Sequence, residues 1–323
     1  MRRSLLWLAL LLPACQSEAP APAPAELPPD SLYIGYAHAG SDDLMLSAWQ
    51  AGVSGTEATA PRLLALVGPD ETDLVPIQPG EAAADADRLK RRRGQRLTGR
   101  NVLNLIVSQG LNCGRVGAAS FIEARLQDAP VVAVAGMPSR NPDRGRMLLR
   151  RRPGLAEESV EAMQQRRFVV WEHGAFYRAS ASQWMDAAGL SEARPTLAER
   201  PDGESLAEHF DKQSADYAFV VAGRKGDTDD ARYGTVVDLK PEAFADPQLL
   251  QSLLVCRTDS VTTHRSDLLA LMKRWQSTHA QSAPTPVDTA KLDALMALLA
   301  TTNIISGTVP TTDWVDELAG GTP

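Results

Sequence analysis

Two neighbouring segments, NCGRVGAASFIEA (residues 112–124) and APVVAVA (residues 129–135), decide the fold of this chain. Residues 113–116 predict a strand, and the small residues at 117–120 open a helix. The second segment is a near-continuous apolar run, which is typical of a strand inside a parallel sheet. The alternation of strands and helices predicts an α/β architecture.

A similar unit stands near the start of the chain. Residues 32–37 predict a short buried strand, and a turn at 38–40 follows it. Ser41 is a natural N-cap, and Asp42 suits the positive end of a helix that ends near Gly52. Because both residues also serve ordinary capping, each is a candidate for a structural role as well as for ligand contact.

The rest of the chain continues the alternation of strands and helices. The second strand of the sheet is expected at either 62–67 or 73–78. We expect the tail from Thr311 to Pro323 to be loosely attached. Further strands are expected at 147–150, 167–171, 216–221 and 253–257, and helices at 102–108, 159–165, 176–188, 205–210, 264–275 and around Leu292 to Leu299.

The first fifteen residues have the pattern of an export signal. A basic start precedes a short apolar run (residues 4–12), which cannot span a bilayer, and Cys15 follows a small residue. This pattern resembles the lipobox of a bacterial lipoprotein, in which cleavage before the cysteine leaves a lipidated N-terminus. The alternative is an ordinary signal peptide. We therefore expect a signal peptide over 1–14, then over 15–30 the lipidated Cys15 and a Pro/Ala tether.

The leader also predicts where the mature protein lies. It would be extracytoplasmic and lipid-anchored in the cell envelope, on the periplasmic face if the host is Gram-negative. The family rule makes aspartate after the lipidated cysteine a signal for retention in the inner membrane. Gln16 stands there instead, which leaves the outer membrane open.

Composition excludes several classes of protein. The formal net charge is -7, and removal of the two leader arginines makes it -9, which argues against a nucleic-acid partner. The basic run at 88–96 therefore fits a solvated helix or loop better than a docking or lipid-headgroup surface. After Cys15, no apolar run is long enough for a second membrane span. Cys113 and Cys256 are too few for a disulfide-dense scaffold, although an oxidising compartment permits one bridge.

The chain lacks the common catalytic and metal-binding motifs. Its five histidines have no H-E-x-x-H spacing, and no G-x-S-x-G elbow or G-x-G-x-x-G loop occurs. We therefore expect no catalytic residue, no metal site and no cofactor.

The order of segments resembles the periplasmic-binding-protein type II fold, and it is most similar to the sulfonate/nitrate/thiamine-precursor group of ABC-transporter substrate-binding proteins. Strand 33–36 with its polar turn, the two segments quoted first, and strand 253–257 with the helix after it carry the resemblance. It implies two lobes, each a mixed sheet flanked by helices, joined by two crossing segments. Lobe one would comprise residues 31–146 and 254–323, and lobe two residues 147–253.

The sequence departs from this group in two places. The family usually carries an acidic residue where Asn112 or Cys113 stands. The segment 53–100 is longer and more basic than in the family. Both departures bear on the identity of the ligand.

In this fold the ligand lies beyond the carboxyl ends of the strands, where helix N-termini point unpaired N–H groups into a cleft between the lobes. Trp171 fits a core as well as a cleft wall, whereas Asp216 and Tyr217 fit structural roles better. The candidate wall from lobe one is Tyr36, His38, Ser41, Asp42, Ala118, Ala119 and Ser120. The candidate wall from lobe two is Trp171, Glu172, His173, Gly174, Ala175 and Tyr177, with Asp216 and Tyr217 as further candidates.

These residues mix acids, aromatic rings and a histidine, which favours a zwitterionic, heteroaromatic or hydroxylated organic ligand over sulfate or a phosphonate. The resemblance implies a monomer that closes around a small organic ligand and delivers it to an ABC permease in the membrane. The alternatives are a lipid or sterol-type carrier or a sensory receptor on the same fold. An enzyme of the pyrimidine-synthase type is less favoured, because its cysteine-rich motif is missing.

The resemblance also places Cys113 and Cys256 on neighbouring strands. Because disulfides between adjacent strands need unusual geometry, we expect two buried free thiols.

Overall fold

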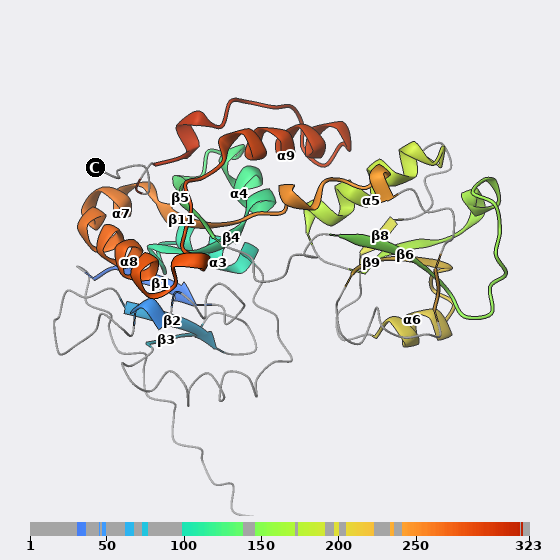
Figure 1. The fold of residues 1–323 in the computed structure, drawn as a ribbon, viewed down its shortest axis with the longest axis horizontal. Coiled ribbons are helices and arrows are strands. Elements are labelled where there is room, and N and C mark those ends of the chain that lie inside the picture. The colour runs from blue at the N-terminus through green and yellow to red at the C-terminus, as the bar shows by residue number, and fades with distance from the viewer. Residues whose placement is uncertain are drawn as a thin grey trace, which may run out of the picture.

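The computed structural model of the chain contains two β-sheets, each with helices on both faces, side by side along the long axis of the molecule (Figure 1). No helix in the part of the chain that the structure describes is long and apolar enough to cross a bilayer. The structure describes residues 31–36, 45, 47–49, 62–67, 73–76, 99–137, 146–171, 174–190, 197–199, 205–222, 233–235, 241–316 and 318.

The larger sheet has six strands in the order β3-β2-β1-β4-β11-β5. Strand β1 runs parallel to β2 and β4, whereas β11 runs antiparallel between β4 and β5. Both candidates for the second strand form, because β3 pairs antiparallel with β2. The six strands are β1 (Tyr33–Tyr36), β2 (Arg62–Val67), β3 (Asp73–Pro76), β4 (Cys113–Gly117), β5 (Val131–Met137) and β11 (Ser252–Arg257).

Helices cover both faces of the larger sheet. One face carries α3 (Gly99–Val107), α4 (Ala118–Arg125) and α9 (Thr289–Thr301). The other face carries α8 (Arg265–Thr278), preceded by the short α7 (Thr258–Thr263). The buried side chains of α8 recur three and four residues apart, so they form one apolar stripe toward the sheet. These side chains are Leu268, Leu271, Met272 and Trp275.

The smaller sheet has five strands in the order β10-β6-β9-β7-β8. Strand β7 runs parallel to β8 and β9, and β6 runs antiparallel to β9. Helix α5 (Ala175–Ala187) packs on one face and α6 (Leu206–Asp211) on the other, with the 3-10 turn η1 (Glu161–Gln165) before β7. The five strands are β6 (Met147–Arg151), β7 (Phe168–Val170), β8 (Leu197–Glu199), β9 (Tyr217–Val221) and β10 (Gly234–Thr235).

The chain crosses twice between the sheets. The first crossing joins β5 to β6, and the second runs through the 3-10 turns η2 (Pro241–Ala243) and η3 (Pro247–Leu249) into β11. This arrangement confirms the predicted α/β fold with two lobes. We call the part around the larger sheet lobe one and the part around the smaller sheet lobe two; the predicted residue boundaries between them stay a prediction.

The C-terminal segment is packed rather than loose. The Thr311 hydroxyl is buried and donates to the carboxylate of Asp293 (2.8 Å). The ring of Trp314 lies edge-on to Phe121, with centroids 6.1 Å apart, and the Arg125 guanidinium lies over it. The prediction of a loosely attached tail is therefore wrong for its described part, because one aromatic anchor and one hydroxyl hold it to α4 and α9.

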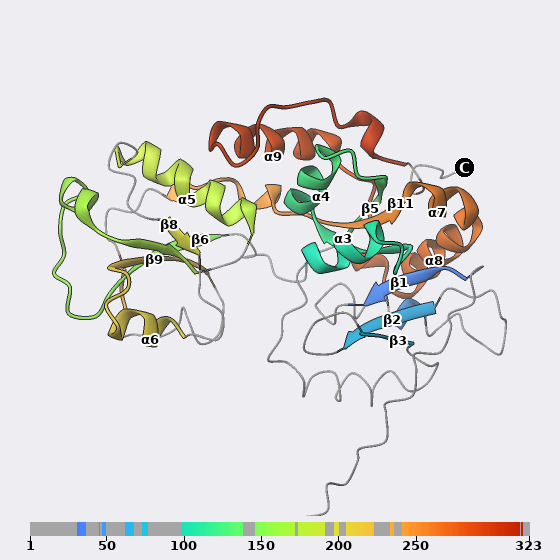
Figure 2. The ribbon, with the colours of Figure 1, turned by 180° about the vertical axis from the view of Figure 1, so that it is seen from behind.

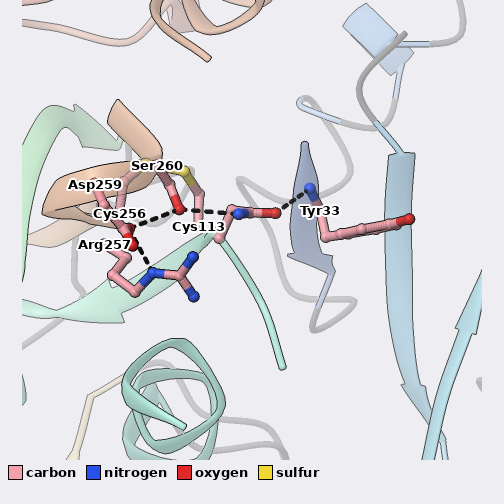
Figure 3. Close-up of a disulfide and its surroundings, with 7 residues drawn as sticks. Tyr33, Cys113, Cys256, Arg257, Asp259 and Ser260 are labelled. Atoms are coloured by element: carbon pink, nitrogen blue, oxygen red, sulfur yellow. Dashed lines mark hydrogen bonds and ion pairs between the residues drawn. A yellow bond between two sulfur atoms is a disulfide. The ribbon is translucent and has the colours of Figure 1, made fainter. Parts of the chain in front are cut away.

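Cys113 and Cys256 form a disulfide in the middle of the larger sheet, so the prediction of two free thiols is wrong (Figure 3). The two residues lie directly opposite each other on β4 and β11. The neighbouring pair is hydrogen-bonded, since the Arg257 N–H donates to the Asn112 carbonyl. The cysteines therefore occupy a non-hydrogen-bonded position, where opposed side chains approach most closely. Both are fully buried.

A hydrogen-bond network surrounds the disulfide (Figure 3). The side chain of Asn112 accepts from the Tyr33 N–H (2.7 Å) and donates to the Ser260 hydroxyl (2.9 Å). That hydroxyl in turn donates to Asp259, which also pairs with Arg257. The network ties β1, β4 and α7 together at the edge of the sheet where β1 and β4 begin. We call this side of the sheet, formed by the ends of the strands and not by an outermost strand, the far edge.

Candidate ligand-binding site

The opposite edge of the larger sheet, which we call the near edge, is where β1 and β4 end. Their carboxyl ends meet there because the two strands are parallel. Strand β11 enters the sheet from lobe two at the same edge, with Ser252 level with Gly117. The near edge therefore faces lobe two, as a ligand site between lobes requires.

Helix α4 begins at the near edge, directly after β4. Its N-cap is Gly117, which supplies no side-chain acceptor, and the Ala118 N–H donates to the Gln251 carbonyl (3.0 Å). A Cβ added at Gly117 would meet no described atom within 4 Å. The first amides of a helix lack intrahelical partners, so this end of α4 favours an incoming acceptor oxygen.

Helix α5 of lobe two begins in the same way, after β7. Its N-cap is Gly174, and no side chain of the described residues caps the helix. Gly174 has φ +124°, a backbone conformation that favours glycine. Two helix N-termini, one from each lobe, are thus capped by residues without a side chain.

The structure brings helices α4 and α5 into contact. In the view from behind the two helices are neighbours (Figure 2). Ala118 and Ala119 of α4 belong to the same apolar cluster as Ala175 and Tyr177 of α5. These four predicted site residues therefore border the same apolar cluster although they come from different lobes. Ser120 is half-buried in the first turn of α4.

Trp171 lies in the core of lobe two. Its side chain is buried, and its ring centroid is 5.3 Å from that of His209 on α6. It belongs to a different apolar cluster from the starts of α4 and α5. Tyr36 ends β1 at the near edge, but its side chain is outside the described residues. So are the further predicted site residues His38, Ser41, Asp42, Glu172 and His173.

Asp216 and Tyr217 lie at the other end of the smaller sheet. Tyr217 is level with Phe168, where β7 begins, so it is not brought to the start of α5. The Asp216 carboxylate accepts hydrogen bonds from the Arg152 guanidinium (3.1 Å) and the Arg167 N–H (3.1 Å). Ion pairing rather than an open cleft thus surrounds Asp216 in the described part of lobe two.

The Tyr217 phenol completes this network. It donates to Glu158 (2.8 Å), which also accepts two hydrogen bonds in a fork from Arg166. The hydrogen bonds from Arg166 hold the pKa of the Glu158 carboxyl below its ordinary value. Burial, followed by the bond to Glu158, raises the pKa of the Tyr217 phenol above its ordinary value. The network fastens the loop before β7 to the start of β9.

One residue at the near edge escaped the prediction from the sequence. The guanidinium of Arg115 donates to the Ser252 hydroxyl (3.4 Å). Since Ser252 is level with Gly117, the Arg115 side chain extends along β4 toward the near edge, on the sheet face that carries α8. The alternation of C-G-R-V-G places Arg115 on the same face as Cys113, which was the signal that this charge lies over the sheet.

Among the described residues, no three His, Cys, Asp or Glu side chains are grouped so as to hold a metal ion. A hollow of about 440 Å³ lies elsewhere, between the second crossing segment, the start of β6 and the middle of α5. Its lining does not include the starts of α4 and α5, so it is separate from the candidate site. The lining residues are Arg146, Met147, Leu148, Gln183, Glu242, Phe244, Ala245, Asp246 and Pro247.

Comparison by sequence finds no relatives: no protein-family model and no curated protein matches the chain. Comparison by structure finds similar folds. The alkanesulfonate-binding protein SsuA from Xanthomonas axonopodis pv. citri, bound to MOPS, is 11% identical with a TM-score of 0.52, and the match covers 90% of this chain and 99% of that one.

Two further structures have the same level of similarity. The ligand-binding component of an ABC-type import system from Staphylococcus aureus, with zinc bound, is 10% identical with a TM-score of 0.52, covering 89% of this chain and 96% of that one. A periplasmic sulfonate-binding protein SsuA from Methylobacillus flagellatus KT is 9% identical with a TM-score of 0.51, covering 89% and 91%. Identities this low bear on fold alone. The chain has the two-lobed periplasmic-binding-protein type II fold.

Proposed function

We propose that the chain is an extracytoplasmic solute-binding lipoprotein, anchored through Cys15, that captures a small organic ligand between its lobes and delivers it to an ABC permease. One observation carries the proposal. Helices α4 and α5 come from different lobes, are in contact, and each begins at a glycine without a side-chain cap. Helix N-termini facing each other across two lobes can hold one ligand from both sides.

The chemistry of the site favours a ligand with charges of both signs. The amides at the starts of α4 and α5 favour an acceptor or anionic group. The predicted wall residues Asp42 and Glu172 would receive a cationic or hydroxyl group. MOPS, which the Xanthomonas protein binds, has this combination of an amine and a sulfonate.

The proposal requires binding and closure but no covalent chemistry. The ligand would bind an open form, and the closed form would be the one that the permease recognises. We propose a monomer without cofactor or enzymatic activity, of the sulfonate/nitrate/thiamine-precursor group. The site would comprise the near-edge residues Ala118, Ala119 and Ser120 together with Gly174, Ala175 and Tyr177.

Native mass spectrometry of residues 30–323, purified without denaturant, tests the proposal. We expect a discrete small-molecule adduct that is lost on denaturation. The variant Gly117→Leu projects a side chain into the space in front of α4 and should lose the adduct while remaining folded. The matched control Gln276→Leu adds an apolar side chain on the exposed surface of α8 and should keep it. An adduct that survives in Gly117→Leu would contradict this location.

A thermal-shift experiment with two probes tests the ligand class. At a concentration one hundred times its dissociation constant, a ligand should stabilise the protein by about 2.7 kcal/mol. We expect stabilisation by MOPS and none by sulfate at near-neutral pH. Tight sulfate binding would contradict a zwitterionic ligand.

The small apolar residues of the site favour one second candidate. Ala118, Ala119 and Ala175 line the helix starts within an apolar cluster, which also suits a lipid or sterol-type cargo. A lipid adduct in the same mass measurement would replace nutrient uptake by the carrier function.

A further inference from the structure

Helix α5 belongs to the cores of both lobes. Phe176 and Ala179, in its first half, are part of the apolar cluster that covers one face of the larger sheet. Trp184 and Met185, in its second half, are part of the cluster under the smaller sheet. The first half contacts α4 and α9 of lobe one, and both views show the end of α9 directed toward α5 (Figures 1 and 2). The first half of this one helix is therefore packed in the core of lobe one, and its second half in the core of lobe two.

The middle of α5 is fixed to the second crossing segment. Ser180 is fully buried, and its hydroxyl oxygen accepts from the Ala245 N–H (3.1 Å). Ala245 also belongs to the lobe-one cluster. The point where α5 passes from one core to the other is thus the point where the chain returns toward lobe one.

We infer that Phe176 is a positioning residue that sets the arrangement of the two lobes. Its side chain comes from lobe two and is 1% exposed within the core of lobe one. Any motion that carries α5 away with lobe two must withdraw this ring from apolar surroundings. Burial of a phenylalanine ring favours the arrangement in which it is buried.

Phe176 is also placed to act on the proposed ligand site, two residues after Gly174. Its neighbour Tyr177 contacts both clusters and lies against the Phe176 ring, with centroids 5.4 Å apart. Because the buried Phe176 ring fixes the first turn of α5, it also fixes the position of the amides at the start of that helix. The inference extends the proposed function, but it concerns the lobes themselves and can be tested without a ligand.

The test measures the distance between the lobes in the ligand-free protein. Spin labels on Lys273→Cys in α8 and Asp211→Cys in α6, both exposed positions, report one distance between lobes by pulsed electron resonance. The buried disulfide does not react with the labels. We expect Phe176→Ala to lower the population of the original lobe arrangement, relative to all other arrangements, by about tenfold. The distribution of distances between the two labels should therefore widen or shift. Phe176→Leu, which keeps most of the apolar contact, should have a smaller effect and decides the matter if Phe176→Ala does not fold.

Met185→Ala is the matched control. Met185 is a buried residue of the same helix, but it belongs to the lobe-two cluster. It should lower stability and leave the distance distribution unchanged. Equal effects of Phe176→Ala and Met185→Ala, or an unchanged distribution in a folded Phe176 variant, would overturn the inference. If the parent protein shows no mass adduct but Phe176→Ala alters the distance distribution, the inference about Phe176 stands. That result would count only against the proposed ligand site.

Discussion

The two edges of the larger sheet are built in opposite ways. At the far edge, a disulfide joins β4 to β11, and the Asn112 side chain links β1 to α7. At the near edge, Gly117 ends β4, and no side chain of the described residues caps the helix that follows. The far edge thus holds the strands in register through side chains, whereas the described part of the near edge has a glycine at the corresponding position.

The smaller sheet repeats this contrast with different chemistry. Where β7 and β9 begin, the ion pairs around Glu158 and Asp216 hold the chain together. Where β7 ends, Gly174 starts α5 without a side-chain cap. In lobe one the interaction that joins the strands is a covalent disulfide, and in lobe two it is a set of ion pairs. Redox conditions should therefore change the stability of lobe one, and pH that of lobe two.

The largest expected effect is loss of the disulfide. The double variant Cys113→Ala/Cys256→Ala should lower the free energy of unfolding by about 5 kcal/mol, because the bond spans a sequence separation of 143 residues. Urea unfolding measures this. A reductant should destabilise the parent protein by a similar amount and have no effect on the double variant. A change below about 1 kcal/mol would show that the far edge does not depend on the bond.

The next largest effect is expected at Asn112. Its substitution by alanine leaves the Tyr33 N–H and the Ser260 hydroxyl without this partner and should cost about 2 kcal/mol. Ser260→Ala removes one of the two Asn112 bonds, together with the bond that the Ser260 hydroxyl donates to the exposed Asp259, and should cost about half as much. Equal losses would mean that the bond to Tyr33 contributes nothing to the far edge.

A smaller effect on the free energy of unfolding, about 1 kcal/mol, is expected when Tyr217→Phe removes the hydrogen bond to Glu158. Urea unfolding of the variant and the parent measures it.

The pH dependence of the stability of lobe two comes from Glu158, whose carboxyl has a lowered pKa in the folded state. The stabilisation is complete above the ordinary value of 4.5 and is lost as pH falls through the lowered pKa. The stability difference between the parent and Glu158→Gln should therefore be constant at neutral pH and shrink in acid. A difference that grows in acid would contradict the ion pair with Arg166.

The smallest effect on stability is expected at the near edge. Gly117 has φ -69°, which any residue adopts, and a Cβ there meets no described atom. Gly117→Leu should change the free energy of unfolding by less than about 0.5 kcal/mol, while it abolishes ligand binding. A large loss of stability would show that the space in front of α4 is filled by the protein itself.

Most of the fold follows from local patterns in the sequence. The strands that form at Cys113–Gly117 and Val131–Met137 were predicted at 113–116 and 130–135, together with the helix between them, from small and apolar runs. The pairing of β11 with β4 came from the resemblance to a known fold rather than from any pattern in the residues. Strands β8 and β10 were not predicted, because three and two residues carry no usable period.

The errors concern contacts between distant residues. The pairing of Cys113 with Cys256 depends on which rungs of the ladder are hydrogen-bonded, and no local pattern in the sequence reveals that register. Trp314 stands alone in a polar segment, so nothing nearby indicated its contact with Phe121. Of the predicted site, Ala118, Ala119, Ala175 and Tyr177 belong to one apolar cluster, whereas Asp216 and Tyr217 lie at the opposite end of their sheet, and the binding role of all of them stays a prediction.

The disulfide also changes the topology of the molecule. Because it joins Cys113 to Cys256, the chain between them is a closed covalent ring that contains the smaller sheet and both crossings. A single proteolytic cut within the ring, or a new pair of termini placed there, leaves one connected molecule. Lobe two can therefore be nicked or replaced without releasing either half of lobe one.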